Sequence, residues 1–421
     1  MTAAAPDLAV SERTMGDAVP RIATLDLARG IAVLGILAVN IAGLAGPSVS
    51  VYSPNLPAPG SPADEAVFAA MLVLFEGKMR ALFCIVFGAS LLLFVERTDA
   101  AGGDGEVLQI RRLGWLAVIG YLHFLLLWWG DILFVYAIAG LAALALRLLP
   151  SAATVIATLL MFTAWQAEGI HRQLPLAQAE AAVAQGTASS AQRLDLAAEQ
   201  AARADGEAAE LAALRAGFDA RLAGQLADWL YPIELALSAL GETLTYMLTG
   251  LLLLRSGFFS GAWSAAALRW LAWGGLGLGG GMTLAFTAWA WRHGFPEEAM
   301  RLAIGHGLAF PHLLMALGYL ALLQLAAPRL LASGLGKRVR AAGRVTLTNY
   351  VGTSLVMGAM FQGWGLGLGL RYGEAALLSF VALGWLAMLA WSAPWLRHFT
   401  LGPLEWLWRT LAERRPIPFK R

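Results

Sequence analysis

The feature that most constrains this chain is the recurrence of apolar stretches about as long as a lipid bilayer is thick. A helix needs about 20 mostly apolar residues to cross a membrane, and the first such stretch, LDLARGIAVLGILAVN, runs from Leu25 to Asn40. The whole chain is 58% hydrophobic and only 14% charged, whereas soluble proteins are about 45–50% apolar and about 25% charged. The excess is too large for a buried core, so the sequence predicts an all-α, polytopic membrane helix bundle.

Ten apolar segments approach the length of a membrane span. They cover about residues 22–44, 79–95, 112–129, 131–149, 151–167, 229–254, 262–290, 303–326, 344–366 and 374–395. A shorter helix over about residues 64–77 is expected to lie against this bundle or to re-enter it.

The orientation of the chain follows from its Lys and Arg residues, which favour the cytoplasmic side in short loops. With ten spans, the basic residues around positions 13–21, 97–112, 147, 255, 329–344 and 397–421 all fall on one side. Both termini are therefore predicted to be cytoplasmic, and the protein is expected to be a multi-pass protein of a bacterial inner membrane.

The spans divide the chain into two halves. We expect a disordered cytoplasmic tail over 1–21, a five-span N-terminal half over 22–167, an extracytoplasmic helical segment over 168–228, a five-span C-terminal half over 229–395 and an interfacial cytoplasmic tail over 396–421. In the extracytoplasmic segment, leucines and a phenylalanine recur at steps of three and four between 211 and 226, which predicts one amphipathic helix in a hairpin. A dispensable insertion and a binding module both fit this segment.

Several classes of function are excluded by composition. The single cysteine, Cys84, rules out a disulfide framework and a cysteine-based metal site. His306 and His312 are six residues apart, which places them on different faces of a helix, so no metal site is expected. No basic tract indicates nucleic-acid binding. The lipid bilayer is the expected partner, and the sequence leaves the oligomeric state open, a homo-oligomer included.

Two polar residues in the first apolar stretch are candidates for function because charge in a membrane helix is costly. Arg29 and Asn40 are eleven residues apart, which is about three turns, roughly 16 Å, and nearly the same helix face. Arg29 is predicted near the cytoplasmic end and Asn40 near the external end. A topology anchor and an interhelical hydrogen bond explain them equally well.

The run Glu76-Gly77-Lys78-Met79-Arg80 places two basic residues on the predicted external side, against the trend of the other loops. These cations need a partner or a ligand. Glu76 could neutralise one of them in a simple ion pair, and an acceptor-binding role for Glu76, Lys78 and Arg80 is the alternative.

A third set of candidates comprises His123, Asp131 and His306 on the predicted external side, and Arg344 on the cytoplasmic side. A histidine beside a carboxylate can act as a general base, because the carboxylate orients the ring. A lone histidine in a helix is more often a packing residue. The nearness of His123 to Asp131 in the sequence favours the functional interpretation.

The ordered motifs of the chain resemble the YeiB-like membrane proteins. The resemblance runs from Leu25-Asp26 to Asn40, through Phe75-Glu76-Gly77-Lys78, through His123 with Gly130-Asp131-Ile132-Leu133, and into the C-terminal half. There, Gly343-Arg344 with Leu347-Thr348-Asn349-Tyr350, and Gly402-Pro403-Leu404-Glu405-Trp406, are similar to domain-of-unknown-function type 418. Nearly the whole chain is covered, except the N-terminal tail and 168–228.

The N-terminal half of this family is similar to two sets of membrane acyltransferases, the heparan-glucosaminide acetyltransferases and the acyltransferase-3 group. The resemblance implies transfer of an acyl group from cytoplasmic acyl-CoA to an acceptor across the membrane. In the acyltransferase-3 group, the first span carries an arginine and, eleven positions later, a histidine. Arg29 matches the arginine, whereas Asn40 replaces the histidine and cannot act as a base.

These observations lead to a hypothesis with two alternatives. In the hypothesis, Arg29 and Arg344 bind the phosphates of acyl-CoA, His123 is the base and Asp131 orients it. Asn40, together with Glu76, Lys78, Arg80 and His306, positions a glycan or lipid-linked acceptor that offers a hydroxyl or an amine. The alternatives are a transporter for a small anionic or amphipathic solute, which two five-span halves would suit, and a non-catalytic membrane assembly protein.

Overall fold

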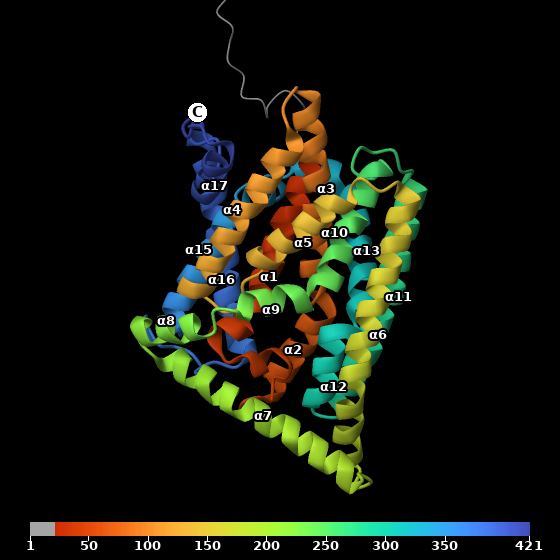
Figure 1. The fold of residues 1–421 in the computed structure, drawn as a ribbon, viewed down its shortest axis with the longest axis vertical. Helices are drawn as coiled ribbons and strands as arrows, with labels where there is room; N and C mark the ends of the chain where they lie inside the picture. Colours follow the sequence, from red (N-terminus) through yellow and green to blue (C-terminus); the bar gives the residue numbers. More distant parts are fainter. Residues whose placement is uncertain (1–21) are drawn as a thin grey trace, which may run out of the picture.

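The protein is described by a computed structural model that covers residues 22–421. The described residues form helices joined by short loops, without a named β-strand (Figure 1). The α-helices are α1 (Ala23–Ala45), α2 (Pro62–Leu74), α3 (Lys78–Ala100), α4 (Gly105–Leu126), α5 (Leu133–Leu146), α6 (Ser151–Ala184), α7 (Ser190–Arg215), α8 (Phe218–Ala227), α9 (Tyr231–Ser238), α10 (Leu240–Arg255), α11 (Ala265–Arg292), α12 (Glu297–Leu302), α13 (Ala309–Ala332), α14 (Gly334–Arg344), α15 (Thr346–Phe361), α16 (Glu374–His398) and α17 (Pro403–Glu413). A 3₁₀ turn, η1 (Ser48–Val51), and a π-helical turn, η2 (Ala303–Gly307), complete the described elements.

The long helices run along the bundle, and α7 crosses one of its ends (Figure 1). The C-terminus and α17 lie at the opposite end. The all-helical class predicted from the sequence is confirmed. The predicted tail over 1–21 lies outside the described residues.

Five helical segments are long and apolar enough to cross a membrane, and a sixth qualifies if a bent pair counts as one span. The five are α1, the continuous stretch of α2 and α3, α6, α13 and α16. Among the other predicted spans, α5 has only 14 residues and α15 only 16, and α4 contains a glutamate and two arginines. These segments fall short by length or by charge, so the count of ten spans and the cytoplasmic termini stay predictions.

The predicted span over 229–254 is wrong in one respect, because it is not one straight helix. α9 ends at Ser238 and α10 begins at Leu240, with a bend of 58° between them. The single amphipathic helix predicted over 211–226 is also wrong. α7 ends at Arg215, and α8 begins at Phe218 after an extended Ala216-Gly217 pair. Apolar residues at steps of three and four indicate the apolar face of each helix, but they do not indicate the break between the two helices.

The two halves of the chain are interleaved. α3 packs along α10, and α1 packs along α14, α15 and α16. A Cβ atom at Gly88 of α3 would overlap the Met247 carbonyl of α10, and one at Gly250 of α10 would overlap the Ile85 carbonyl of α3. Glycines allow this approach of one backbone to another, as in membrane helix pairs generally. The N-terminal half therefore does not form a separate body.

The C-terminal tail contains one helix, α17, which closes one end of α15. The buried Glu405 carboxylate accepts hydrogen bonds from the Leu347 amide (2.7 Å), the Thr348 amide (3.2 Å) and the Thr348 hydroxyl (2.6 Å). These amides lie in the first turn of α15, where helix donors lack partners within the helix. Burial raises the pKa of Glu405 above its usual value, although these hydrogen bonds oppose the shift. Capping of α15 thus accounts for the glutamate in the Gly402-Pro403-Leu404-Glu405-Trp406 motif.

Candidate functional site

The most enclosed polar pair is His123, on α4, with Asp131, in the turn before α5. Nδ1 of His123 lies 3.0 Å from Oδ1 of Asp131, and both side chains are at most 2% exposed. The second carboxylate oxygen accepts the Phe134 amide at 2.7 Å and so caps the start of α5. This bond fixes Asp131 in place, which lets the carboxylate orient the ring.

The outer face of His123 is covered by Tyr350 of α15. The two ring centroids are 5.0 Å apart, and the Tyr350 hydroxyl lies 3.3 Å from the Ile132 amide, which donates to it. Neither ring nitrogen of His123 has a hydrogen bond of good geometry to a described residue. The Asp131 contact is therefore close but poorly aligned, and Nε2 is left without a partner.

Arg29 and Asn40 lie toward opposite ends of α1. Arg29 pairs with Asp26 on the same helix at 3.0 Å, and it also donates to the Ser90 hydroxyl of α3. Its side chain is 30% exposed. Asn40 is half-buried and makes no side-chain hydrogen bond to any described residue. Arg344, at the end of α14, donates to the Thr400 carbonyl at 3.3 Å.

The basic residues at the start of α3 meet partners inside the bundle. Arg80 pairs with Glu242 of α10 at 2.5 Å, and the Glu242 carboxylate also accepts the Tyr246 hydroxyl at 2.7 Å. Lys78 is fully buried and donates to the Leu72 carbonyl at 2.6 Å. Glu242 was not among the partners predicted for Arg80 from the sequence.

Glu76 and His306, the other predicted acceptor-binding residues, lie away from His123 in the chain and differ in setting. Glu76 lines a small cavity of about 30 Å³ between α1 and α2, together with Glu374. His306, in η2, lies against Trp165 of α6 with ring centroids 4.4 Å apart. Among residues 22–421, no group of three or more His, Cys, Asp or Glu side chains is placed to hold a metal ion.

A larger cavity, of about 570 Å³, lies under α7 and α8. Its walls come from six parts of the chain: the ends of α1, α4 and α15, together with α7, α8 and α9. Phe124, which follows His123 in α4, and Trp128, just after α4, are among the lining residues of the cavity. His123 itself does not line it. The cavity is therefore next to the His123–Asp131 pair but separated from it by packed side chains.

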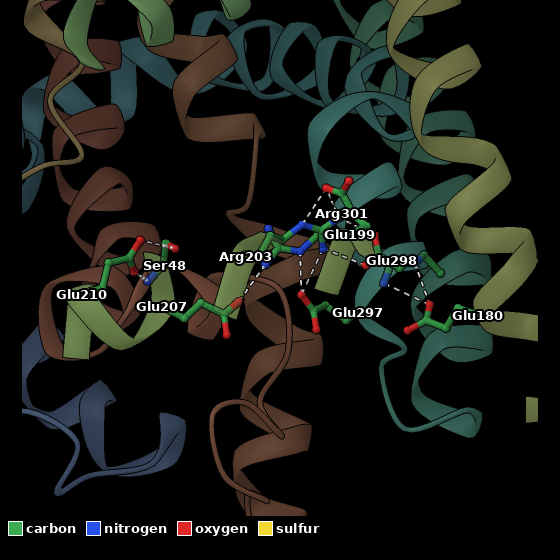
Figure 2. Close-up of polar contacts among 10 residues, drawn as sticks. Ser48, Glu180, Glu199, Arg203, Glu207, Glu210, Glu297, Glu298 and Arg301 are labelled. Carbon is green, nitrogen blue, oxygen red and sulfur yellow. Dashed lines mark hydrogen bonds and ion pairs between the residues drawn. The ribbon is translucent and has the colours of Figure 1, made fainter. Parts of the chain in front are cut away.

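An ionic cluster holds α7 against the end of the bundle (Figure 2). Arg203 of α7 makes two hydrogen bonds to Glu298 of α12, at 2.7 and 3.1 Å, and two to Glu199 on its own helix. Although burial opposes it, these carboxylates raise the pKa of Arg203 above its usual value. Glu210, also on α7, accepts the Ser48 amide at 2.6 Å and the Ser48 hydroxyl at 2.9 Å. Glu207 of α7 also lies 3.6 Å from Arg301 of α12, so Arg203, Glu207 and Glu210 all attach α7 to the bundle.

Comparisons with known proteins find uncharacterised relatives. The family model described as "Protein of unknown function (DUF418)" matches residues 253–415. The chain is 30% identical to the uncharacterized protein YeiB of Escherichia coli, over 94% of this chain and 98% of YeiB. It is 28% identical to an uncharacterized 39.9 kDa protein of Bacillus acidopullulyticus and 26% identical to the uncharacterized protein YxaH of Bacillus subtilis, over 93–94% of this chain and 94–95% of each relative.

No solved structure matches the chain. Each alignment covers nearly the full length of this chain and of the relative, so the similarity is not confined to one half of the chain. The resemblance noted from the motifs of the sequence is confirmed, and the chain belongs to the YeiB-like family of membrane proteins that carry a DUF418 region.

Proposed function

We propose that this protein is a membrane acyltransferase that takes an acyl group from acyl-CoA and transfers it to a hydroxyl or an amine of a glycan or lipid-linked acceptor. The observation that carries the proposal is the His123–Asp131 pair, with 3.0 Å between Nδ1 and Oδ1 and with Nε2 unpartnered. A buried histidine held by a fixed carboxylate is the arrangement of a general base.

In the proposed reaction, Nε2 of His123 takes the proton from the acceptor hydroxyl or amine. The acceptor oxygen or nitrogen then forms a bond to the acyl carbonyl carbon, and the bond from that carbon to the CoA sulfur breaks. The proton on His123 passes to the departing thiolate. Asp131 stabilises the positively charged ring between these two steps. Because Tyr350 covers His123, the ring of Tyr350 must swing aside before an acceptor can reach Nε2.

Arg29 and Arg344 are proposed to bind the phosphates of acyl-CoA. The Arg29 side chain is 30% exposed, and among residues 22–421 only the carboxylate of Asp26 lies within ion-pair distance of it. Arginine suits phosphate because its planar guanidinium can donate two parallel hydrogen bonds. Asn40, Lys78 and His306 are proposed to contact the acceptor.

The proposal is tested with the purified full chain, acetyl-CoA and membrane lipid extract, by following release of free CoA thiol. We expect His123→Ala to abolish acceptor-dependent release, and Asp131→Asn to lower it by about 100-fold or more, as removal of general base catalysis does. His171→Ala is the matched control, because His171 lies exposed on α6. Full activity of the His123→Ala protein would refute this assignment.

A transporter is the second candidate, and the Arg80–Glu242 pair, in which the carboxylate is buried, favours it. This pair lies between α3 and α10, and Glu242 is only 2% exposed. Buried ion pairs in membrane bundles often mark a route for protons or ions. The transporter predicts that a solute crosses a liposome membrane unmodified and that His123→Ala leaves this flux intact. If neither activity depends on these residues, an assembly role is favoured instead.

A further inference from the structure

The 570 Å³ cavity under α7 and α8 contains a buried arginine that lacks a carboxylate partner. Arg221 of α8 is only 4% exposed, and it lines the cavity. One of its terminal nitrogens donates to the Leu126 carbonyl at the end of α4, whereas its Nε has no hydrogen bond to a described residue. No acidic side chain in the described chain lies within ion-pair distance of Arg221.

A buried cation without a counter-charge is costly. The carbonyls of Leu125 and Leu126 in α4, which accept from Arg221, compensate only part of that cost. Burial lowers the pKa of Arg221, and no acidic group raises it. Arg203, a half-buried arginine at the same end of the bundle, has carboxylates on two sides. The contrast indicates that the missing partner of Arg221 is an anionic group of a ligand in the cavity.

The walls of the cavity indicate what else this ligand carries. Trp229 and Leu230 line the cavity and are also 54% and 43% exposed on the outer surface. Leu226 of α8, and Ile233 and Leu237 of α9, are exposed as well. Aromatic and apolar side chains exposed beside a polar pocket are typical of the membrane interface. The cavity thus joins an anion site to a surface that suits acyl chains.

We propose that this cavity binds the anionic headgroup of a membrane lipid, with a phosphate or carboxylate at Arg221 and the apolar chains along α8 and α9. Three acids also line the cavity. The Glu210 carboxylate accepts the Ser48 amide and hydroxyl, whereas Asp228 and Glu234 are exposed and in this proposal contact the hydroxyls of the headgroup. The inference deepens the proposed function, on which it rests only in naming this lipid as the acceptor. Binding itself does not depend on acyl transfer.

The experiment measures binding of dihexanoyl phosphatidylglycerol to the purified full chain in detergent, by the concentration that half-saturates its thermal stabilisation. Dihexanoyl phosphatidylcholine and inorganic phosphate are the two comparison probes, and no acyl-CoA is added. We expect phosphatidylglycerol to bind best. Arg221→Gln should weaken phosphatidylglycerol binding by at least about tenfold, because a charge-assisted hydrogen bond is lost. Arg215→Gln is the matched control, since Arg215 is exposed at the end of α7.

A second variant, Ala213→Phe, keeps Arg221 but adds volume to the cavity wall, and it should weaken binding as well. Equal binding of the two lipids would overturn the anionic site. If inorganic phosphate binds as well as phosphatidylglycerol, the cavity is a site for a free anion and not for a lipid. Binding that survives both Arg221→Gln and Ala213→Phe would place the lipid elsewhere. If the protein binds this lipid here but releases no CoA in the acetyl-CoA assay described above, the transferase would be refuted and this site would stand.

Discussion

Replacing Arg203 with glutamine should release α7 from the end of the bundle. Arg203 makes two hydrogen bonds to Glu298, and the Glu298 side chain is only 3% exposed. Removing one partner from a buried ion pair costs about 3–5 kcal/mol, because the other charge stays buried and unpaired. Since Arg203 itself is 21% exposed, we expect a smaller loss, about 2–3 kcal/mol, with part of the charge screened by solvent.

This loss acts on the local opening of α7 and not on the unfolding of the whole bundle, because Arg203 connects α7 only to α12 and to its own helix. A loss of about 2–3 kcal/mol corresponds to an opening equilibrium about 30–150 times larger. Amide hydrogen exchange of the full chain in detergent reports this equilibrium segment by segment. The amides of α7 should exchange faster by that factor, whereas those of α1 and α3 should not change.

Arg172→Gln provides the matched control on a neighbouring helix. Its pair with Glu168 is exposed, at 63% and 58% for the two side chains, and such surface pairs contribute about 0.5 kcal/mol or less. The control should change α7 exchange by less than about threefold. The reasoning is refuted if Arg203→Gln behaves like Arg172→Gln, or if α1 and α3 loosen together with α7.

Three further predictions concern the interior and the topology. Glu242→Gln leaves Arg80, whose side chain is 31% exposed, without its counter-charge inside the bundle. This change should lower thermal stability by more than Glu242→Ala combined with Arg80→Ala, as a scan of both proteins would show. Gly77→Ala should prevent stable expression, because Gly77 has φ 70° and an added Cβ would overlap a buried histidine ring; a normal unfolding temperature would contradict this. Cysteines introduced at Ser190 and Leu335, in a protein whose native cysteine is buried, should react with an impermeant maleimide from opposite sides of the membrane, and labelling from the same side would contradict the ten-span topology.

Local sequence patterns predicted the helices well because each apolar run needs only its own residues to be recognised. The first stretch illustrates this, since the predicted span over 22–44 corresponds to α1, Ala23–Ala45. The predicted contact of His123 with Asp131 depends on a tight turn between neighbouring helices, which short-range sequence can indicate. The bend between α9 and α10 has no such mark, because no proline or glycine pair lies at Ser238-Ala239-Leu240.

The partner of Arg80 could not be predicted for a different physical reason. Apolar periodicity shows which face of a helix is buried, but not which other helix packs against that face. Glu242 lies in the middle of the predicted span over 229–254, but the sequence does not name its partner, and only the packing of α3 on α10 brings it to Arg80. Arg221 was missed likewise, since its burial depends on α8 folding back onto the end of α4.

The pairing of Arg80 with Glu242 has a consequence for the order in which the chain is made. Arg80 enters the membrane with the first half of the protein, whereas Glu242 is synthesised about 160 residues later, a delay of about 10–30 s at ribosomal speed. During that interval the arginine lacks the carboxylate with which it forms an ion pair in the folded protein. The nascent first half must therefore wait at the insertion machinery, or keep water around Arg80, until α10 arrives to complete the bundle.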